Sequence, residues 1–225
     1  MKNYKLVVIE GVDSSGKQTQ TEKLFQKISS MNLKTEKIVF PNYESDTSSL
    51  VKMYLGGKFG TNANDVNPYM ASAFFAVDRV GSIKCEWADR LNSADVVIAD
   101  RYVTSNMIHQ ASKIENAKDK DEFLDWVYDF EYGKLELPKP DLIIFLDMPV
   151  KYALELMKNR PNKIDSSDVK DIHESDANYL NKSYENAVSV ADKYGWHKIS
   201  CVKDGKIRTI DDISEEIFEA FKTIM

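Results

Sequence analysis

The stretch Lys5-Leu-Val-Val-Ile-Glu-Gly-Val-Asp-Ser-Ser-Gly-Lys17 decides the fold of this chain. Its apolar run at residues 6–10 lacks polar alternation until its end, which is typical of a strand buried on both faces of a parallel sheet. From Lys17 onward, apolar residues recur at helical spacing. The pattern therefore predicts a strand, a short loop and a helix, with Gly11 and Gly16 bounding the loop.

Two glycines separated by four residues and followed by a lysine have the spacing of a phosphate-binding loop. Such a loop directs backbone N–H groups and the positive end of a helix dipole at an anion, and the lysine reaches the outer phosphates. The alternative is an ordinary strand-to-helix corner that needs its glycines only for positive φ. The first interpretation predicts an ATP site made by Gly11, Val12, Asp13, Ser14, Ser15, Gly16, Lys17, Gln18 and Thr19.

The length of 225 residues fits one α/β domain spanning residues 1–225. Hydrophobic residues make up 43% and charged residues 29% of the chain, and no apolar run approaches the roughly 20 residues of a membrane helix. The net charge of −6 argues against a nucleic-acid polymer as partner, because duplex binding needs a basic face. The N-terminus lacks a signal-peptide pattern, so we expect a cytoplasmic protein. Cys85 and Cys201 lack metal or redox spacing, and we expect free, buried thiols.

Four further apolar runs follow the first, at residues 35–40, 94–99, 141–146 and 197–202, with helical sequence between them. This alternation predicts an α/β fold, a doubly wound parallel sheet of about five strands. In such sheets, ligands bind beyond the carboxyl ends of the strands. The residues that follow each strand are therefore the first candidates for chemistry.

Two carboxylates that follow strands are candidate metal ligands. Gln18 stands where a serine or threonine normally ligates Mg²⁺, so we expect phosphates, water and a carboxylate such as Asp13 to hold the ion. Asp100 and Arg101 directly follow the third apolar run, where the carboxylate could face Mg²⁺ and the guanidinium could face phosphate. The alternative for this pair is a mutual surface salt bridge.

The helix predicted at residues 68–91 carries Phe75 and Arg79 four positions apart, and therefore on one face. A ring that stacks on a base and a guanidinium that grips its phosphate would form a nucleotide clamp. The alternative places Phe75 in the core and leaves Arg79 as a solvated charge.

Two carboxamides lie one helical turn apart after the third strand, at Asn106 and Gln110. A carboxamide donates and accepts hydrogen bonds at once, which suits the hydrogen-bonding edge of a base. The alternative is helix capping by Thr104 or Ser105, with Asn106 in the first turn.

The segments after residue 118 predict three helices and a polar segment between two of them. Residues 119–132 predict a structural helix, and residues 171–194 and 213–224 predict two more. Between them, residues 159–170 are polar and turn-forming, with Arg160 among lysines and acids. This composition suits a mobile lid that closes cations over phosphates, and it equally suits a plain surface loop.

Together these residues resemble the thymidylate kinase family, a nucleoside monophosphate kinase group of the P-loop proteins. The resemblance spans nearly the whole chain and depends on the order and spacing of its motifs. These are Ile9-Glu-Gly-Val-Asp-Ser-Ser-Gly-Lys-Gln-Thr-Gln20, Phe40-Pro41, Phe75-Ala-Val-Asp-Arg79, Asp100-Arg-Tyr-Val-Thr-Ser-Asn106, Pro140-Asp-Leu-Ile-Ile-Phe-Leu-Asp147 and Asp171-Ile-His-Glu174.

The resemblance implies a homodimeric enzyme that uses Mg²⁺ and transfers the γ-phosphoryl group of ATP to thymidine 5′-monophosphate (dTMP). It implies that Phe75 stacks on thymine, that Arg79 and Arg101 hold the acceptor phosphate, and that Asn106 and Gln110 read the base edge. Two rivals remain at this stage: a kinase of the same fold acting on another nucleoside or nucleotide, and a nucleotide-binding protein without catalysis.

The same resemblance implies roles for the remaining candidates. Lys17 would hold the donor phosphates, and Asp13 would lie near the sugar and the metal, with Asp100 reaching the metal through water. Arg160 would reach the transferring group from the lid. Phe40 belongs to the substrate site, and His109 stands where an aromatic residue usually crowds the sugar 2′ position.

Overall fold

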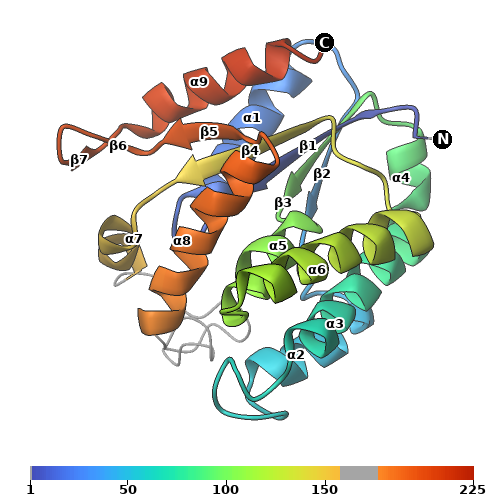
Figure 1. Ribbon diagram of the computed structural model, residues 1–225. Coiled ribbons are helices and arrows are strands. Elements are labelled where there is room, and N and C mark those ends of the chain that lie inside the picture. Colours follow the sequence, from blue (N-terminus) through green and yellow to red (C-terminus); the bar gives the residue numbers. More distant parts are fainter. Residues whose placement is uncertain (1, 158–176) are drawn as a thin grey trace.

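The computed structural model describes residues 2–157 and 177–225 (Figure 1). Its centre is a parallel five-stranded sheet in the order β2-β3-β1-β4-β5, which confirms the predicted fold class. The strands are β1 (Lys5–Glu10), β2 (Thr35–Val39), β3 (Val96–Asp100), β4 (Leu142–Asp147) and β5 (His197–Ser200). The expected lid at residues 159–170, with Arg160, lies outside the described residues.

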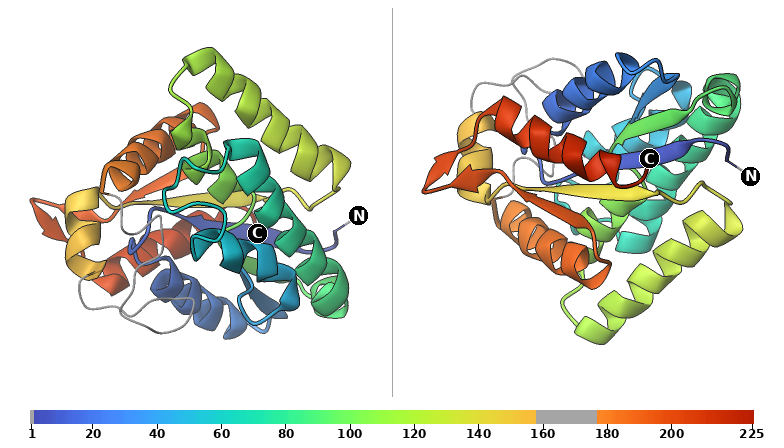
Figure 2. Two further views of the ribbon diagram at one scale, coloured as in Figure 1. Left: turned by 90° about the horizontal axis from the view of Figure 1, so that it is seen from below. Right: turned by 90° about the horizontal axis from the view of Figure 1, so that it is seen from above.

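Helices cover both faces of the sheet (Figures 1 and 2). On one face α1 (Lys17–Ser29) packs beside α9 (Ile210–Lys222), and on the other lie α5 (Thr104–His109), α6 (Ala117–Tyr128) and α8 (Ala177–Lys193). Side chains of β1 alternate between the two cores: Leu6 and Val8 join the α5–α6–α8 side, whereas Val7 and Ile9 join the α1–α9 side. Burial on both faces explains why residues 6–9 of this strand are all apolar.

Two predicted helices are interrupted by wider turns. The helix expected at residues 68–91 is α3 (Pro68–Gly81), a π-helical turn (Ser82–Glu86) and α4 (Ala88–Asn92). The helix expected at residues 119–132 leaves α-helical geometry after α6 and continues as a second π-helical turn (Asp129–Lys134). Such turns are rare and occur frequently at functional sites, and apolar spacing does not reveal them.

The remaining elements are short. They are α2 (Ser49–Leu55), α7 (Val150–Met157), the 3₁₀ turns Asp46–Ser48 and Ala111–Lys113, and an antiparallel hairpin of β6 (Val202–Lys203) and β7 (Lys206–Ile207). Helix α9 begins three residues earlier than predicted, because Thr209 caps it by accepting a hydrogen bond from Asp212 N. No helix among the described residues is long and apolar enough to span a membrane.

The two cysteines differ in their surroundings. Both are free thiols, as expected, but Cys85 is exposed, so its expected burial is wrong. It lies in the π-helical turn after α3, where most side chains face outward. Cys201 is buried, and burial raises the pKa of its thiol to about 12.

Candidate active site

A cavity of about 490 Å³ lies beyond the carboxyl ends of the strands and gathers most of the predicted site residues. Those from the glycine loop and the start of α1 are Asp13, Ser14, Gly16, Lys17, Gln18 and Thr19. Those from α3, from α5 and the residue after it, and from the carboxyl ends of β2 and β3 are Phe40, Phe75, Arg79, Asp100, Arg101, Asn106, His109 and Gln110. Gly11, Val12 and Ser15 are buried in the loop behind this surface.

The glycine loop has the conformation that the spacing predicts. Gly16 adopts a left-handed conformation (φ 92°) immediately before α1, and Gly11 has φ 155°. A Cβ at Gly11 would lie 2.5 Å from Ser15 Oγ and 3.1 Å from Leu146 O, so the loop and β4 approach closely here. Lys17 Nζ donates to Gly11 O (3.0 Å) and Val12 O (2.8 Å), which folds its ammonium over the loop.

Arg101 is held by two contacts inside the cavity. Its backbone is left-handed (φ 66°), a strained conformation for a non-glycine residue that is frequent at functional sites. Its Nη2 donates to Asp13 Oδ1 (2.6 Å) and its Nη1 to His109 Nε2 (2.9 Å). Burial disfavours the charged guanidinium, but nearby carboxylates, first Asp13 and then Glu10, raise the pKa of Arg101 above its ordinary value. Since a guanidinium only donates, His109 accepts through an unprotonated Nε2.

Glu10 holds the chain segment that follows Arg101, and the sequence analysis did not identify Glu10 as a site residue. Its carboxylate is fully buried at the end of β1, and Oε1 accepts from Tyr102 N (3.2 Å), Thr104 Oγ1 (2.7 Å) and Ser105 Oγ (2.8 Å). The suggested capping of α5 by Thr104 or Ser105 is therefore wrong, because both hydroxyls bind Glu10 instead. The sequence feature that could have identified Glu10 is a charged residue at the end of an otherwise apolar buried strand.

Arg79 is buried and paired, so its expected alternative as a solvated charge is wrong. Only 1% of its surface is exposed, and it forms a bidentate ion pair with Glu131, in which Nε donates to Oε2 and Nη2 donates to Oε1, both at 2.6 Å. Asn106 Nδ2 donates to the same Oε1 (2.8 Å). Arg79 and Asn106 therefore lie next to each other at the cavity wall, joined through one carboxylate that the sequence analysis did not identify.

The side chains nearest these two complete this end of the cavity. Phe75 is partly buried and meets Tyr54 of α2 edge to face, with ring centroids 6.2 Å apart. Its ring lines the cavity, so the alternative of a purely core residue is wrong. Gln110 is 1% exposed and lines the same cavity, and its Oε1 accepts no hydrogen bond within the described residues.

The carboxylates in the cavity fit a magnesium ion held mainly by its substrates. Asp13 and Asp100 both line it, and among the described residues no group of three or more His, Cys, Asp or Glu side chains could hold a metal. Mg²⁺ keeps several waters and is usually bound through one or two carboxylates together with substrate phosphates. Asp13 and Asp100 could supply that number of ligands.

The fold and the cavity define a P-loop kinase of the nucleoside monophosphate class: a glycine loop after β1, a lysine at the start of α1, and a paired arginine after β3. A family model described as "Thymidylate kinase" matches residues 9–206. The chain belongs to the thymidylate kinase family, and its activity is the phosphorylation of dTMP by ATP.

Several relatives support the assignment. Thymidylate kinase of Mycobacterium tuberculosis is 34% identical over 174 residues, covering 76% of this chain and 78% of that protein. Human thymidylate kinase is 32% identical over 151 residues, covering 66% and 63%. The solved structure of thymidylate kinase from Candida albicans superimposes with a TM-score of 0.67 at 21% identity, over 99% of this chain and 93% of that one, and shows the shared fold.

A methyl group at Gly11 tests the glycine loop. We expect Gly11→Ala to weaken ATP binding about tenfold or more, because its Cβ would lie 3.1 Å from the backbone oxygen of Leu146 at a φ of 155°, so the loop amides would have to shift. Titration calorimetry with ATP measures this. Gly133→Ala is the control, since its Cβ meets only the side chain of Asp129 outside the cavity. Unchanged ATP affinity in Gly11→Ala would show that the loop does not cradle phosphates.

Proposed function

We propose that dTMP phosphorylation takes place in this cavity, with ATP and dTMP bound end to end. The observation that carries the proposal is that the glycine loop, Arg101 and the Phe75–Arg79 pair line one continuous cavity. Phosphoryl transfer of this kind has a loose transition state, so the protein contributes mainly by positioning and by neutralising charge. Each residue is therefore assigned by what it can hold in place.

At the donor end, the loop amides and Lys17 hold the phosphates of ATP. The ammonium now donates to the carbonyl groups of Gly11 and Val12 and would exchange those bonds for phosphate oxygens. Mg²⁺ held by Asp13, by Asp100 through water and by phosphate oxygens would neutralise charge there. The assignment of Arg160 stays a prediction, because that residue lies outside the described part of the chain.

At the acceptor end, Arg101 holds the phosphate of dTMP. Asp13 and His109 fix its guanidinium before any substrate arrives. Arg79 was assigned to the same phosphate from the sequence, but Glu131 neutralises it and places it beside Asn106. We therefore propose that Arg79 and Asn106 contact the base, while Phe75 stacks on it. Gln110 lies one turn from Asn106, and His109 lies beside Arg101, where the sugar would pass.

Removing either cation should slow the transfer. Losing a preorganised charged group typically costs about 3–4 kcal/mol in the barrier, so we expect Lys17→Ala and Arg101→Ala each to lower kcat about a hundredfold or more. Steady-state kinetics with saturating ATP and dTMP measure this. Arg90→Ala and Lys27→Ala are matched controls on surface ion pairs outside the cavity. Near-normal kcat in either cavity variant removes that residue from its role.

A panel of acceptors tests the substrate assignment directly. With Mg-ATP, we expect dTMP to give the highest kcat/KM among the deoxynucleoside and ribonucleoside monophosphates, with formation of ADP as the readout. Thymidine should not be an acceptor, because Arg101 is placed for a phosphate. Faster turnover of any other monophosphate, or of a nucleoside, would overturn the proposal.

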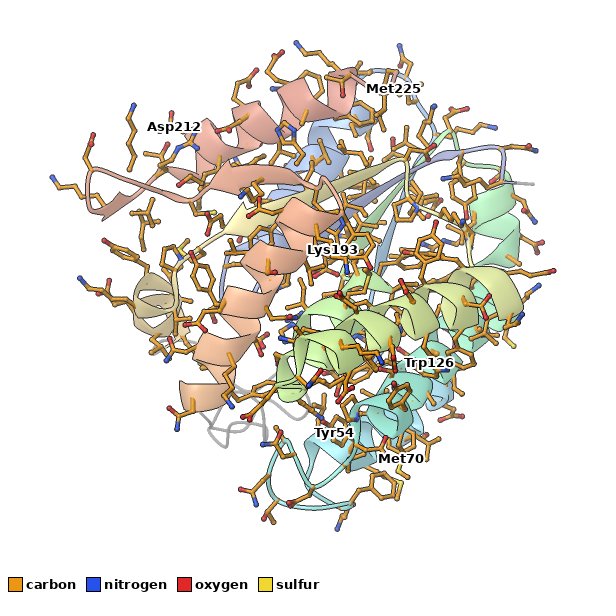
Figure 3. All side chains as sticks on the ribbon, in the orientation of Figure 1. Tyr54, Met70, Trp126, Lys193, Asp212 and Met225 are labelled. Atoms are coloured by element: carbon orange, nitrogen blue, oxygen red, sulfur yellow. The ribbon has the colours of Figure 1, made fainter. Side chains whose placement is uncertain are left out.

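We also propose a homodimer formed through α2 and α3. The exposed face of α3 carries Tyr69, Met70 and Val77 and no charge, because the two charged residues of this helix are buried. Leu50 and Met53 extend the apolar surface onto α2. Met70 lies on the same side of the molecule as Trp126 of α6 (Figure 3), and Tyr69 joins α3 to α6 through Trp126. An uncharged exposed apolar face of this kind marks an interaction site.

The cytoplasmic location expected from the sequence stays a prediction.

A charge on this face tests the dimer. Val77 is 53% exposed and lies on the α3 surface one heptad from Met70, so we expect Val77→Asp to dissociate the dimer without unfolding the chain. Sedimentation equilibrium at about micromolar protein measures the mass. Met31→Asp, at an exposed residue after α1, is the control. A monomeric wild-type chain would contradict the assembly.

A further inference from the structure

Glu131 is a buried carboxylate that none of the sequence motifs includes. It lies in the π-helical turn after α6, and its side chain is fully shielded from solvent. Three donor groups from two residues converge on it from the cavity wall: Nε and Nη2 of Arg79, and Nδ2 of Asn106. A single acidic side chain thus fixes two groups that line the cavity.

The contact with Glu131 fixes the orientation of the Asn106 amide. Nδ2 donates to Glu131 Oε1 (2.8 Å) and to Ser72 O (3.3 Å). Both partners are acceptors only, so this end of the amide must be the NH₂ group. Both hydrogen bonds of the Asn106 side chain within the described residues go through Nδ2, which leaves Oδ1 to a ligand in the cavity that Asn106 lines. Asn106 therefore presents an acceptor to a ligand.

The same carboxylate also fixes Arg79, which presents a hydrogen-bond donor where Asn106 presents an acceptor. Three of the five N–H groups of a guanidinium side chain donate to Glu131 and, at 3.4 Å, to Tyr102 O. The others have no acceptor among the described residues, and Arg79 lines the cavity. A guanidinium has no acceptor, so Arg79 can present only a donor to a ligand. A donor and an acceptor thus stand side by side.

We propose that Glu131 is a positioning residue that sets this donor–acceptor order and thereby selects a 4-oxo pyrimidine over a 4-amino pyrimidine. Thymine and uracil present an accepting O4 beside a donating N3–H, which matches Arg79 beside Asn106 Oδ1. Cytosine presents a donating 4-amino group beside an accepting N3, so both contacts would be mismatched and its buried partners left unpaired. The inference rests on the base-end role proposed above for Arg79 and Asn106.

An isosteric change tests the inference. In Glu131→Gln the new side chain can donate as well as accept, so Asn106 is free to turn over. We expect the ratio of kcat/KM for dTMP to that for dCMP to fall about tenfold or more, through the acceptor KM. The KM for ATP and the kcat with saturating dTMP should stay within about threefold. Asp129→Asn removes a charge from the same turn at an exposed side chain and should change neither.

A double variant separates this role from a general loss of stability. Because Arg79 can only donate, Glu131 can change the donor–acceptor order only through Asn106, so the dTMP preference of Glu131→Gln/Asn106→Ala should equal that of Asn106→Ala alone. Equal losses of activity with dTMP and dCMP in Glu131→Gln, with an unchanged ratio, would overturn the inference and leave only a structural role. Additive losses in the double variant would overturn it as well.

Two further measurements keep the result interpretable. If Glu131→Gln does not fold, Glu131→Asp keeps the charge but withdraws it, and should raise the dTMP KM about fivefold without changing the ATP KM; an unchanged dTMP KM would overturn the inference. Calorimetry with dTMP and dCMP gives the base preference independently of turnover. A wild-type chain that prefers dTMP in binding without phosphorylating it would remove the kinase proposal and leave the role of Glu131 standing.

Discussion

Buried carboxylates at the carboxyl edge of the sheet are the constraint on which the rest of the site depends. Glu10 and Glu131 are completely shielded from water, and each must be satisfied by hydrogen bonds or by a cation. Glu10 takes the amide and hydroxyl groups at the start of α5, and Glu131 takes Arg79 and Asn106. Satisfying these charges places the groups that face the cavity before any nucleotide binds, and such preorganisation is the main contribution that a protein makes to phosphoryl transfer.

Local sequence was sufficient for the parts of the fold that local physics determines. The five apolar runs became the five strands, with ends shifted by one or two residues. The central strands β1 and β3 are the most clearly apolar, because they are buried on both faces of the sheet. The glycine loop followed from spacing alone, since its conformation depends on Gly11 and Gly16 themselves. Once strand order is parallel, Asp100 and Arg101 must reach the same edge as the loop.

Contacts between segments that are distant in the chain could not be predicted from local sequence. Nothing near Arg79 in the chain indicates that Glu131, in another helix, neutralises it. The π-helical turn that carries Glu131 adds a residue to one turn, which shifts the face on which the side chain lies. The phosphate role that the resemblance implies for Arg79 stays a prediction, and the ion pair with Glu131 is the observation that favours the base-end role proposed above.

The same charge accounting explains why a divalent cation belongs in this cavity. Four cationic side chains line it, yet Arg79 is paired with Glu131, Arg101 with Asp13, and Lys37 with Glu22. The wall is therefore much closer to neutral than its number of cations suggests, while two nucleotides bring several negative charges into one low-dielectric space. Lys17, together with an Arg101 that is already paired with Asp13, leaves part of the negative charge of the nucleotides uncompensated. A magnesium ion held by Asp13, Asp100 and the phosphates, as proposed above, would compensate the rest.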